Sequence, residues 1–156
     1  MKDPKVVLGY LIIVGSILTP SPAAYAQDRA IGGFVGEPSG LGIKFVSDAE
    51  NMGMVFNLGW SSRKDEGVDM SAELQWYVYE SKQEQRMRVI WNLGFGPRVT
   101  LFSNPEYGGI ASGGVSFVFP GPSGRHEIHM DAGPAIALSP HLATTLYAMA
   151  GYRFYY

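Results

Sequence analysis

The sequence contains no cysteine and few charged residues, and both shortages restrict what the protein does. Without cysteine, a disulfide scaffold, a cysteine-ligated zinc site and a thiol nucleophile are excluded. Charged residues make up 17% of the chain, against about 25% in an ordinary soluble domain. The formal net charge is −2, so no nucleic-acid partner is expected. The 156 residues are enough for one domain.

The first 26 residues have the composition of a secretory signal peptide. Two lysines lie within residues 1–5, and residues 6–18 form a largely apolar stretch. Ala24, Tyr25 and Ala26 then give the small-x-small pattern that signal peptidase reads. A helix of that apolar stretch spans about 20 Å, short of the hydrocarbon core of about 30 Å, so a membrane anchor is the weaker interpretation. We expect cleavage before Gln27 and a mature domain of residues 27–156.

Apolar and polar residues alternate along most of the mature chain. This period of two residues is typical of β-strands with one apolar face. Gly-, Pro- and Ser-rich turns separate the alternating segments. The predicted strands are 30–37, 41–46, 52–60, 68–79, 87–102, 110–119, 126–138 and 142–156. Eight strands joined by short turns predict an all-β, antiparallel, up-and-down barrel.

The contents of the two strand faces predict which one meets lipid. One face carries bulky side chains such as Trp76, Trp91 and Phe95, too large together for an eight-stranded lumen. In the most regular strands this face has no charged residue before Glu80 at a strand end, whereas a soluble barrel would place charges there. The other face, which includes Tyr79, is rich in glycine, as a crowded interior requires. We predict a transmembrane barrel with its apolar face outward and a polar lumen.

Aromatic residues near the predicted strand ends are placed to form girdles at the two membrane interfaces. If the mature N-terminus is periplasmic, one group falls near the periplasmic rim and Trp60 falls near the opposite rim. The periplasmic group is Trp76, Phe119, Phe154 and Tyr156. The predicted location is therefore the outer membrane, with its lipid as the surrounding partner.

The last residues carry a more specific resemblance. Tyr152, Phe154 and Tyr156 alternate up to a terminal aromatic, and this ending resembles the signal read by the outer-membrane barrel assembly machinery, although Phe is more usual at the last position. The mature chain is similar to the OmpA/OmpX-type small barrels. It also resembles a family of short, uncharacterised bacterial barrels, through residues 36–44 (GEPSGLGIK) and 132–140 (AGPAIALSP). The resemblance implies a fold and a compartment, and no activity.

The predicted lumen face carries a nearly balanced set of charges. These residues are Glu37, Lys44, Asp69, Glu73, Arg88, Arg98, Glu127, Asp131 and Arg153. Folding about Pro140 places Glu127 opposite Arg153, and folding about Gln83 places Asp69 nearly opposite Arg98. Because an unpaired buried charge is costly, we interpret the set as a plug of ion pairs. A charge-gated pore is the less favoured interpretation, as is a metal site formed by Glu127, His129 and Asp131.

No catalytic constellation stands out, so we expect a structural or scaffold barrel without cofactor, metal or assigned protein partner. A lipid-modifying enzyme is the first alternative, but Ser139 and His141 flank a turn proline and have no acidic residue near them. A soluble periplasmic barrel with an apolar ligand is the second. The glycines at 32, 33 and 36 lack the strand-to-helix context of a phosphate loop. The predicted loops are short, and short loops give little surface for an adhesin or receptor.

Overall fold

The computed structural model of the chain describes residues 28–47, 51–61, 67–83, 87–101, 105–139 and 141–156. The strands are β1 (Asp28–Glu37), β2 (Ser39–Ser47), β3 (Met52–Ser61), β4 (Gly67–Gln83), β5 (Met87–Leu101), β6 (Glu106–Gly121), β7 (Gly124–Ser139) and β8 (Ala143–Tyr155). No helix long and apolar enough to cross a membrane lies in this part of the chain. The predicted signal peptide falls outside the described residues.

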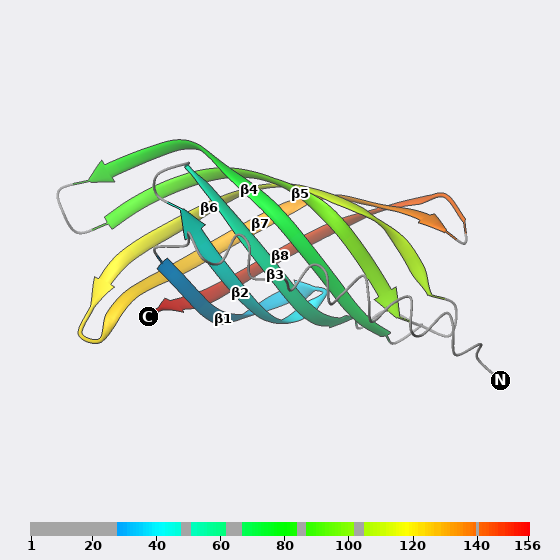
Figure 1. Cartoon of the computed structure of the whole chain (residues 1–156), viewed down its shortest axis with the longest axis horizontal. Helices are drawn as coiled ribbons and strands as arrows, with labels where there is room; N and C mark the ends of the chain where they lie inside the picture. The colour runs from blue at the N-terminus through cyan, green and yellow to red at the C-terminus, as the bar shows by residue number, and fades with distance from the viewer. Residues whose placement is uncertain (1–27, 48–50, 62–66, 84–86, 102–104, 140) are drawn as a thin grey trace.

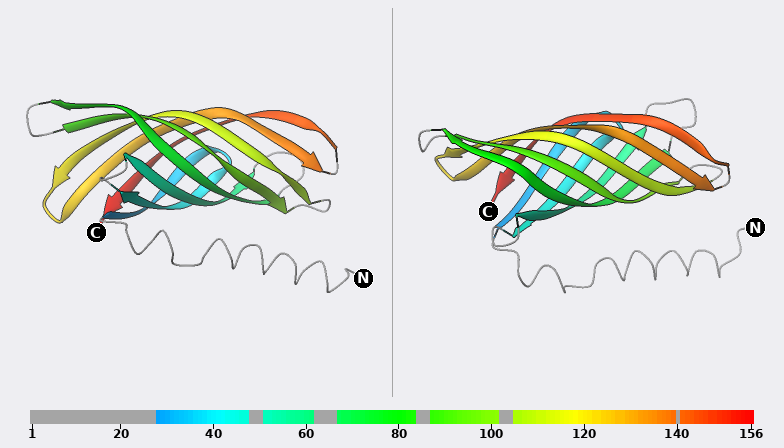
Figure 2. Two further views of the ribbon diagram at one scale, coloured as in Figure 1. Left: turned by 45° about the horizontal axis from the view of Figure 1, so that its top comes forward. Right: turned by 90° about the horizontal axis from the view of Figure 1, so that it is seen from above.

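The eight strands form one closed antiparallel barrel in sequence order. Each strand pairs with the next, and β8 pairs with β1 from Ala30 opposite Tyr155 to Glu37 opposite Ala148. Figure 1 shows the resulting elongated tube, and the two views in Figure 2 show β1–β3 on the wall opposite β5–β7. The predicted all-β, eight-stranded, up-and-down fold is confirmed.

The two ends of the barrel differ in what they carry. The start of β1 and the end of β8 lie at one end, where the Tyr156 amide donates a hydrogen bond to the Arg29 carbonyl oxygen at 3.0 Å. We call this the terminal end, and it also carries the β2–β3, β4–β5 and β6–β7 connections. The other end, which we call the distal end, carries the remaining four hairpin connections, the shortest of them a single residue between β1 and β2.

The apolar face of the strands points outward, as the alternation predicts. On β5, Trp91, Leu93 and Phe95 are about half exposed, whereas the intervening Asn92 and Gly94 are buried. The same alternation recurs along β7, where Ile128 and Met130 are exposed while their neighbours are buried. The barrel therefore has an apolar outer surface, and the side chains that alternate with these outward residues fill its lumen.

A β-bulge in β4 corrects one detail of this prediction. The register between β4 and β5 shifts between Tyr77 and Tyr79, so that Val78 and Tyr79 are both exposed. A bulge inserts one extra residue, and the residues that follow it change face. The expectations that Tyr79 faces the lumen and that Glu80 lies on the apolar face are therefore wrong. Glu80 instead forms an ion pair with Arg88, with 2.8 Å between Oε1 and Nε.

Candidate functional site

The lumen is filled by three successive groups of side chains. One apolar cluster lies toward the terminal end and comprises Ala30, Val46, Ile90, Val118 and Tyr155. A second lies toward the distal end and comprises Phe34, Ile110, Ala135, Tyr147 and Met149. Between them along the strands are charged residues: on β8, for example, Arg153 comes between Tyr155 and Met149. Polar side chains in the middle of the barrel therefore have apolar layers on both sides.

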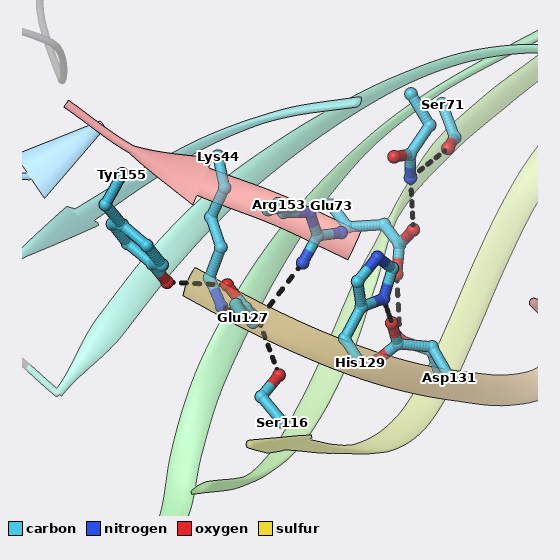
Figure 3. A network of polar contacts seen from close by, with 11 residues as sticks. Lys44, Ser71, Glu73, Ser116, Glu127, His129, Asp131, Arg153 and Tyr155 are labelled. Carbon is cyan, nitrogen blue, oxygen red and sulfur yellow. Dashed lines mark hydrogen bonds and ion pairs between the residues drawn. The ribbon is translucent and has the colours of Figure 1, made fainter. Parts of the chain in front are cut away.

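Six ionisable residues make up what we call the central charge cluster. They come from β2, β4, β7 and β8 and are Lys44, Glu73, Glu127, His129, Asp131 and Arg153. None of the six is more than 3% exposed. Figure 3 shows their side chains converging inside the barrel.

Glu127 is the meeting point of one half of this cluster (Figure 3). Its Oε1 atom lies 2.9 Å from the Lys44 Nζ, 3.2 Å from the Arg153 Nη1 and 2.6 Å from the Ser116 hydroxyl oxygen. Its Oε2 atom accepts a 2.6 Å hydrogen bond from the Tyr155 hydroxyl. The Lys44 ammonium also lies 5.3 Å from the centre of the Tyr77 ring. Two cations and two hydroxyls therefore stabilise one buried carboxylate.

Glu73 has a different set of partners. Its Oε1 atom accepts a 3.2 Å hydrogen bond from the Asn57 amide, and its Oε2 atom accepts a 2.8 Å hydrogen bond from the Ser112 hydroxyl. Asn57 also donates to the Ser71 hydroxyl oxygen at 3.3 Å. Among the described residues, Glu73 forms no ion pair. It is held by neutral donors alone.

His129 and Asp131 form the third contact of the cluster. They lie two residues apart on β7, on the same face, with 2.7 Å between the His129 Nδ1 and the Asp131 Oδ2. The other ring nitrogen of His129 and the other carboxylate oxygen of Asp131 have no hydrogen-bond partner within the described chain. This pair does not share Glu127, so the three residues considered as metal ligands do not converge. No group of His, Asp and Glu in the described ranges is arranged to hold a metal ion.

The remaining predicted lumen residues lie toward the barrel ends. At the distal end the Asp69 Oδ2 accepts from the Arg98 Nη2 at 2.6 Å and from the Thr100 hydroxyl at 2.9 Å. At the terminal end, Arg88 pairs with Glu80 through both carboxylate oxygens. Glu37 is half-buried and is the last residue of β1. The predicted lumen charges are thus split between a central group and two rims.

The strand register explains which cross-strand pairs form. Glu127 stands directly opposite Arg153, as folding about Pro140 predicts. Asp69 stands opposite Thr100 and Arg98 opposite Ser71, so the Asp69–Arg98 ion pair is diagonal. Sequence reasoning missed the second rim pair at the terminal end, between Arg125 and Asp28. It also missed the neutral partners of the buried carboxylates, which no local pattern singles out.

Most of the predicted girdle residues lie near strand ends, whereas Trp76 lies in the middle of β4, opposite Leu93. Trp60 is exposed near the end of β3, Tyr156 is exposed after β8, and Trp76 stacks on Phe95 with ring centres 4.7 Å apart. Phe119 and Phe154 pack on the two sides of one histidine. That residue, His126, hydrogen-bonds through Nδ1 to the Tyr152 hydroxyl, and its ring centre lies 5.6 Å from that of Phe119 and 5.5 Å from that of Phe154.

The two residues considered for catalysis, Ser139 and His141, are both exposed beyond the distal apolar cluster. Within the described ranges neither has an acidic partner in a hydrogen bond or ion pair. The residues brought together by the fold are therefore the buried lumen charges, and these are the candidate functional site.

The closed eight-stranded barrel carries apolar side chains outward and charged side chains inward, an arrangement typical of small transmembrane barrels. The chain is similar to the crystal structure of the N-terminal β-barrel domain of Pseudomonas aeruginosa OprF, with a TM-score of 0.56 and 13% sequence identity, over 84% of this chain and 98% of that one. Comparison with protein-family models and with curated proteins finds no match. The likeness confirms the expected resemblance to OmpA-like barrels at the level of the fold, and at this identity it carries no activity.

Proposed function

We propose that the protein is a structural or scaffold barrel of the outer membrane whose lumen is closed. The observation that carries this proposal is the burial of the central charge cluster, in which no residue is more than 3% exposed. A conducting pore requires a continuous path for water, and eight-stranded barrels of this size are normally filled by side chains. Apolar layers on both sides of the cluster make the same path less favourable.

Membrane lipid is the proposed surrounding of the outer face. Every strand except β6 has large exposed apolar side chains on that face. A hollow on it is lined largely by apolar groups of β5–β8, including Trp91, Leu93 and Met130. Contact with lipid tails keeps this apolar surface away from water, whereas exposing it to water is unfavourable. Export by the predicted signal peptide and insertion by the barrel assembly machinery, through Tyr152, Phe154 and Tyr156, belong to the same proposal.

The short distal connections support a structural role over that of an adhesin or receptor. The connection between β1 and β2 is residue 38 alone, and the others span residues 62–66, 102–105 and 140–142. Connections of this length are ordinary hairpin loops and provide little binding surface.

Two measurements test the proposal. Cell fractionation followed by a gel of unboiled and boiled samples should place the protein in the outer membrane, with the folded barrel migrating differently from the unfolded chain. In planar lipid bilayers the purified barrel should show no steady conductance. Recovery in the soluble periplasm would contradict the membrane assignment, and recurrent single-channel steps that depend on Glu127 would contradict the closed lumen.

A further inference from the structure

The central charge cluster does not balance if its acids are all ionised. It contains three carboxyl groups, on Glu73, Glu127 and Asp131, but only two permanent cations, Lys44 and Arg153. Both cations contact the same atom, Oε1 of Glu127. An uncompensated charge in a buried site is strongly disfavoured, because burial removes the water that would stabilise it. The cluster therefore needs one more positive charge, or one ionised acid fewer.

His129 is a poor place for that positive charge. Its Nδ1 atom faces the Asp131 carboxylate, and a neutral ring that carries its proton on Nδ1 already makes this hydrogen bond. A charged imidazolium would also carry a proton on Nε2, and that nitrogen is buried with no acceptor among the described residues. A buried donor without an acceptor loses the hydrogen bonds that it made in water. The contacts of the ring therefore favour a neutral histidine.

Glu73 is the carboxyl group whose surroundings suit a neutral acid. Its two hydrogen-bond partners, Asn57 on β3 and Ser112 on β6, are uncharged, and on β5 its carboxyl faces Gly94. Three charged or titratable groups act on the Glu73 carboxyl group. Asp131 on β7 repels its negative charge, and Arg153 on β8 attracts it. The third is the Tyr147 hydroxyl, also on β8. Arg153 is already in contact with Glu127.

The Ser112 hydroxyl makes a protonated Glu73 chemically reasonable. A hydroxyl both donates and accepts, so when the Glu73 carboxyl group takes up a proton from solvent, the Ser112 hydroxyl can turn to accept from it and the 2.8 Å contact with Oε2 persists. The Asn57 amide contacts the other carboxylate oxygen, Oε1, through its nitrogen, and its own Oδ1 atom is buried without a hydrogen-bond partner among the described residues. Turning the Asn57 amide over would present that oxygen as a second acceptor.

We propose that the lumen binds one proton on the Glu73 carboxyl group at neutral pH, so that the central charge cluster is electrically neutral. Lys44 and Arg153 then balance Glu127 and Asp131, and Glu73 is a buried carboxylic acid. The inference uses the buried lumen on which the proposed function rests, but it is tested by proton binding rather than by conductance. A barrel that conducts and still holds the proton would overturn the closed lumen alone.

The first test compares the pH dependence of unfolding in wild type and in Glu73→Gln. The full protein is unfolded by urea in detergent micelles between pH 5 and pH 9. If the folded barrel holds a proton that the unfolded chain releases at about pH 4.3, the folding equilibrium constant of the wild type falls up to tenfold for each pH unit across this interval, until Glu73 ionises. Glu73→Gln carries no such proton and should lack this component of the slope, so its unfolding midpoint should approach that of the wild type toward pH 5 and exceed it increasingly as the pH rises.

Asp131→Asn is a matched variant, because it should change the pH dependence of unfolding only if Glu73 binds the proton. A merely structural role of Glu73 predicts no such change. Without the Asp131 charge the cluster has a spare cation, so Glu73 should ionise at lower pH and the slope should end earlier. A slope that is the same in wild type, Glu73→Gln and Asp131→Asn would overturn the proposal. A slope that disappears in His129→Gln and persists in Glu73→Gln would overturn it too, because the proton would then belong to His129.

An infrared spectrum of the folded wild type gives a second measurement that needs no stable variant. The proposal predicts the carbonyl stretch of a protonated carboxylic acid at neutral pH, shifted in heavy water and lost at alkaline pH. The absence of this band would overturn the proposal. Stabilisation of the wild type by sodium or potassium, compared with choline at equal ionic strength, would also overturn it, because a metal ion would then supply the missing charge.

Discussion

Lys44 on β2 and Glu127 on β7 join two walls of the barrel that are not adjacent, with 2.9 Å between the Lys44 Nζ and the Glu127 Oε1. Two strands, β1 and β8, separate them around the barrel. Arg153 approaches the same oxygen from β8. Glu127 is thus a cross-brace inside the lumen, because its side chain fixes elements that the β-ladder alone does not place in contact.

The first prediction concerns the loss of this cross-brace. Glu127→Gln keeps the shape of the side chain but leaves the Lys44 and Arg153 charges buried without a carboxylate. Removing one partner from a buried ion pair costs about 3 to 5 kcal/mol, and here two cations lose their partner. We expect a loss of at least this size in the free energy of unfolding, measured by urea titration with tryptophan fluorescence in detergent micelles.

Glu80→Gln is the matched control, since it makes the same chemical change at the terminal end. The side chains of Glu80 and Arg88 are 24% and 30% exposed, so water replaces the lost interaction. Exposed pairs contribute up to about 1 kcal/mol. Equal losses in Glu127→Gln and Glu80→Gln would show that burial does not set the strength of the central contacts.

The sequence predicted the strands, their order and the direction of the apolar face, because alternation with a period of two is a local property. It placed Glu127 opposite Arg153 because a short turn fixes the register of a hairpin. It was wrong for Tyr79 and Glu80, because one inserted residue reverses every later side chain and no residue type marks the bulge. The alternation also predicts that β4 ends at residue 79, whereas the strand continues, paired with β5, to Gln83.

Contacts across the lumen could not be predicted in the same way. Lys44 meets Glu127 only because the barrel closes and its interior is narrow, and neither condition appears in the order of residues along a strand. The neutral partners of Glu73 are equally hidden, because Asn57 and Ser112 are ordinary inward-facing polar residues. The alternation along each strand identifies such residues as inward-facing. Which of them contact each other across the lumen can be seen only in the three-dimensional structure.

The second prediction concerns inward glycines where neighbouring strands approach closely. At Gly96 an added Cβ atom would collide with the carbonyl oxygen of Ala72 on β4. Because that obstacle is backbone, Gly96→Ala must displace a strand, and overpacking of this kind costs about 1 to 3 kcal/mol. We expect that decrease in the free energy of unfolding in detergent.

Gly113 provides the control for this substitution. A Cβ atom there would lie 3.7 Å from the nearest neighbour, the Leu93 Cδ2, which is an ordinary contact. Gly113→Ala should therefore leave the unfolding midpoint almost unchanged. A large loss in Gly113→Ala would indicate that the effect at Gly96 comes from loss of glycine itself rather than from collision with Ala72.

The third prediction tests which face meets lipid. Leu93 is 55% exposed near the middle of β5, whereas Leu138 is 68% exposed near the distal end of β7. Arginine on the lipid face costs about 2 to 4 kcal/mol at the bilayer midplane and about 0 to 1 kcal/mol near the interface. Leu93→Arg should therefore strongly reduce folding into lipid vesicles, and Leu138→Arg should not. If both variants fold as well as the wild type, the outer face is not in contact with hydrocarbon.

The last prediction concerns the aromatic ending of β8. Tyr152 and Tyr156 point outward, whereas Tyr155 points into the lumen and donates to Glu127. If the outward aromatics are read by the assembly machinery, Tyr156→Ser should lower the amount of folded barrel in the outer membrane of cells. It should have little effect on refolding of purified protein, because Tyr156 is 69% exposed and its backbone hydrogen bond to Arg29 does not involve the side chain. Tyr155→Phe should do the reverse, weakening the purified barrel through the lost hydrogen bond and leaving recognition intact. If Tyr156→Ser lowers the amount of folded barrel equally in cells and in refolding of purified protein, the residue acts through stability alone.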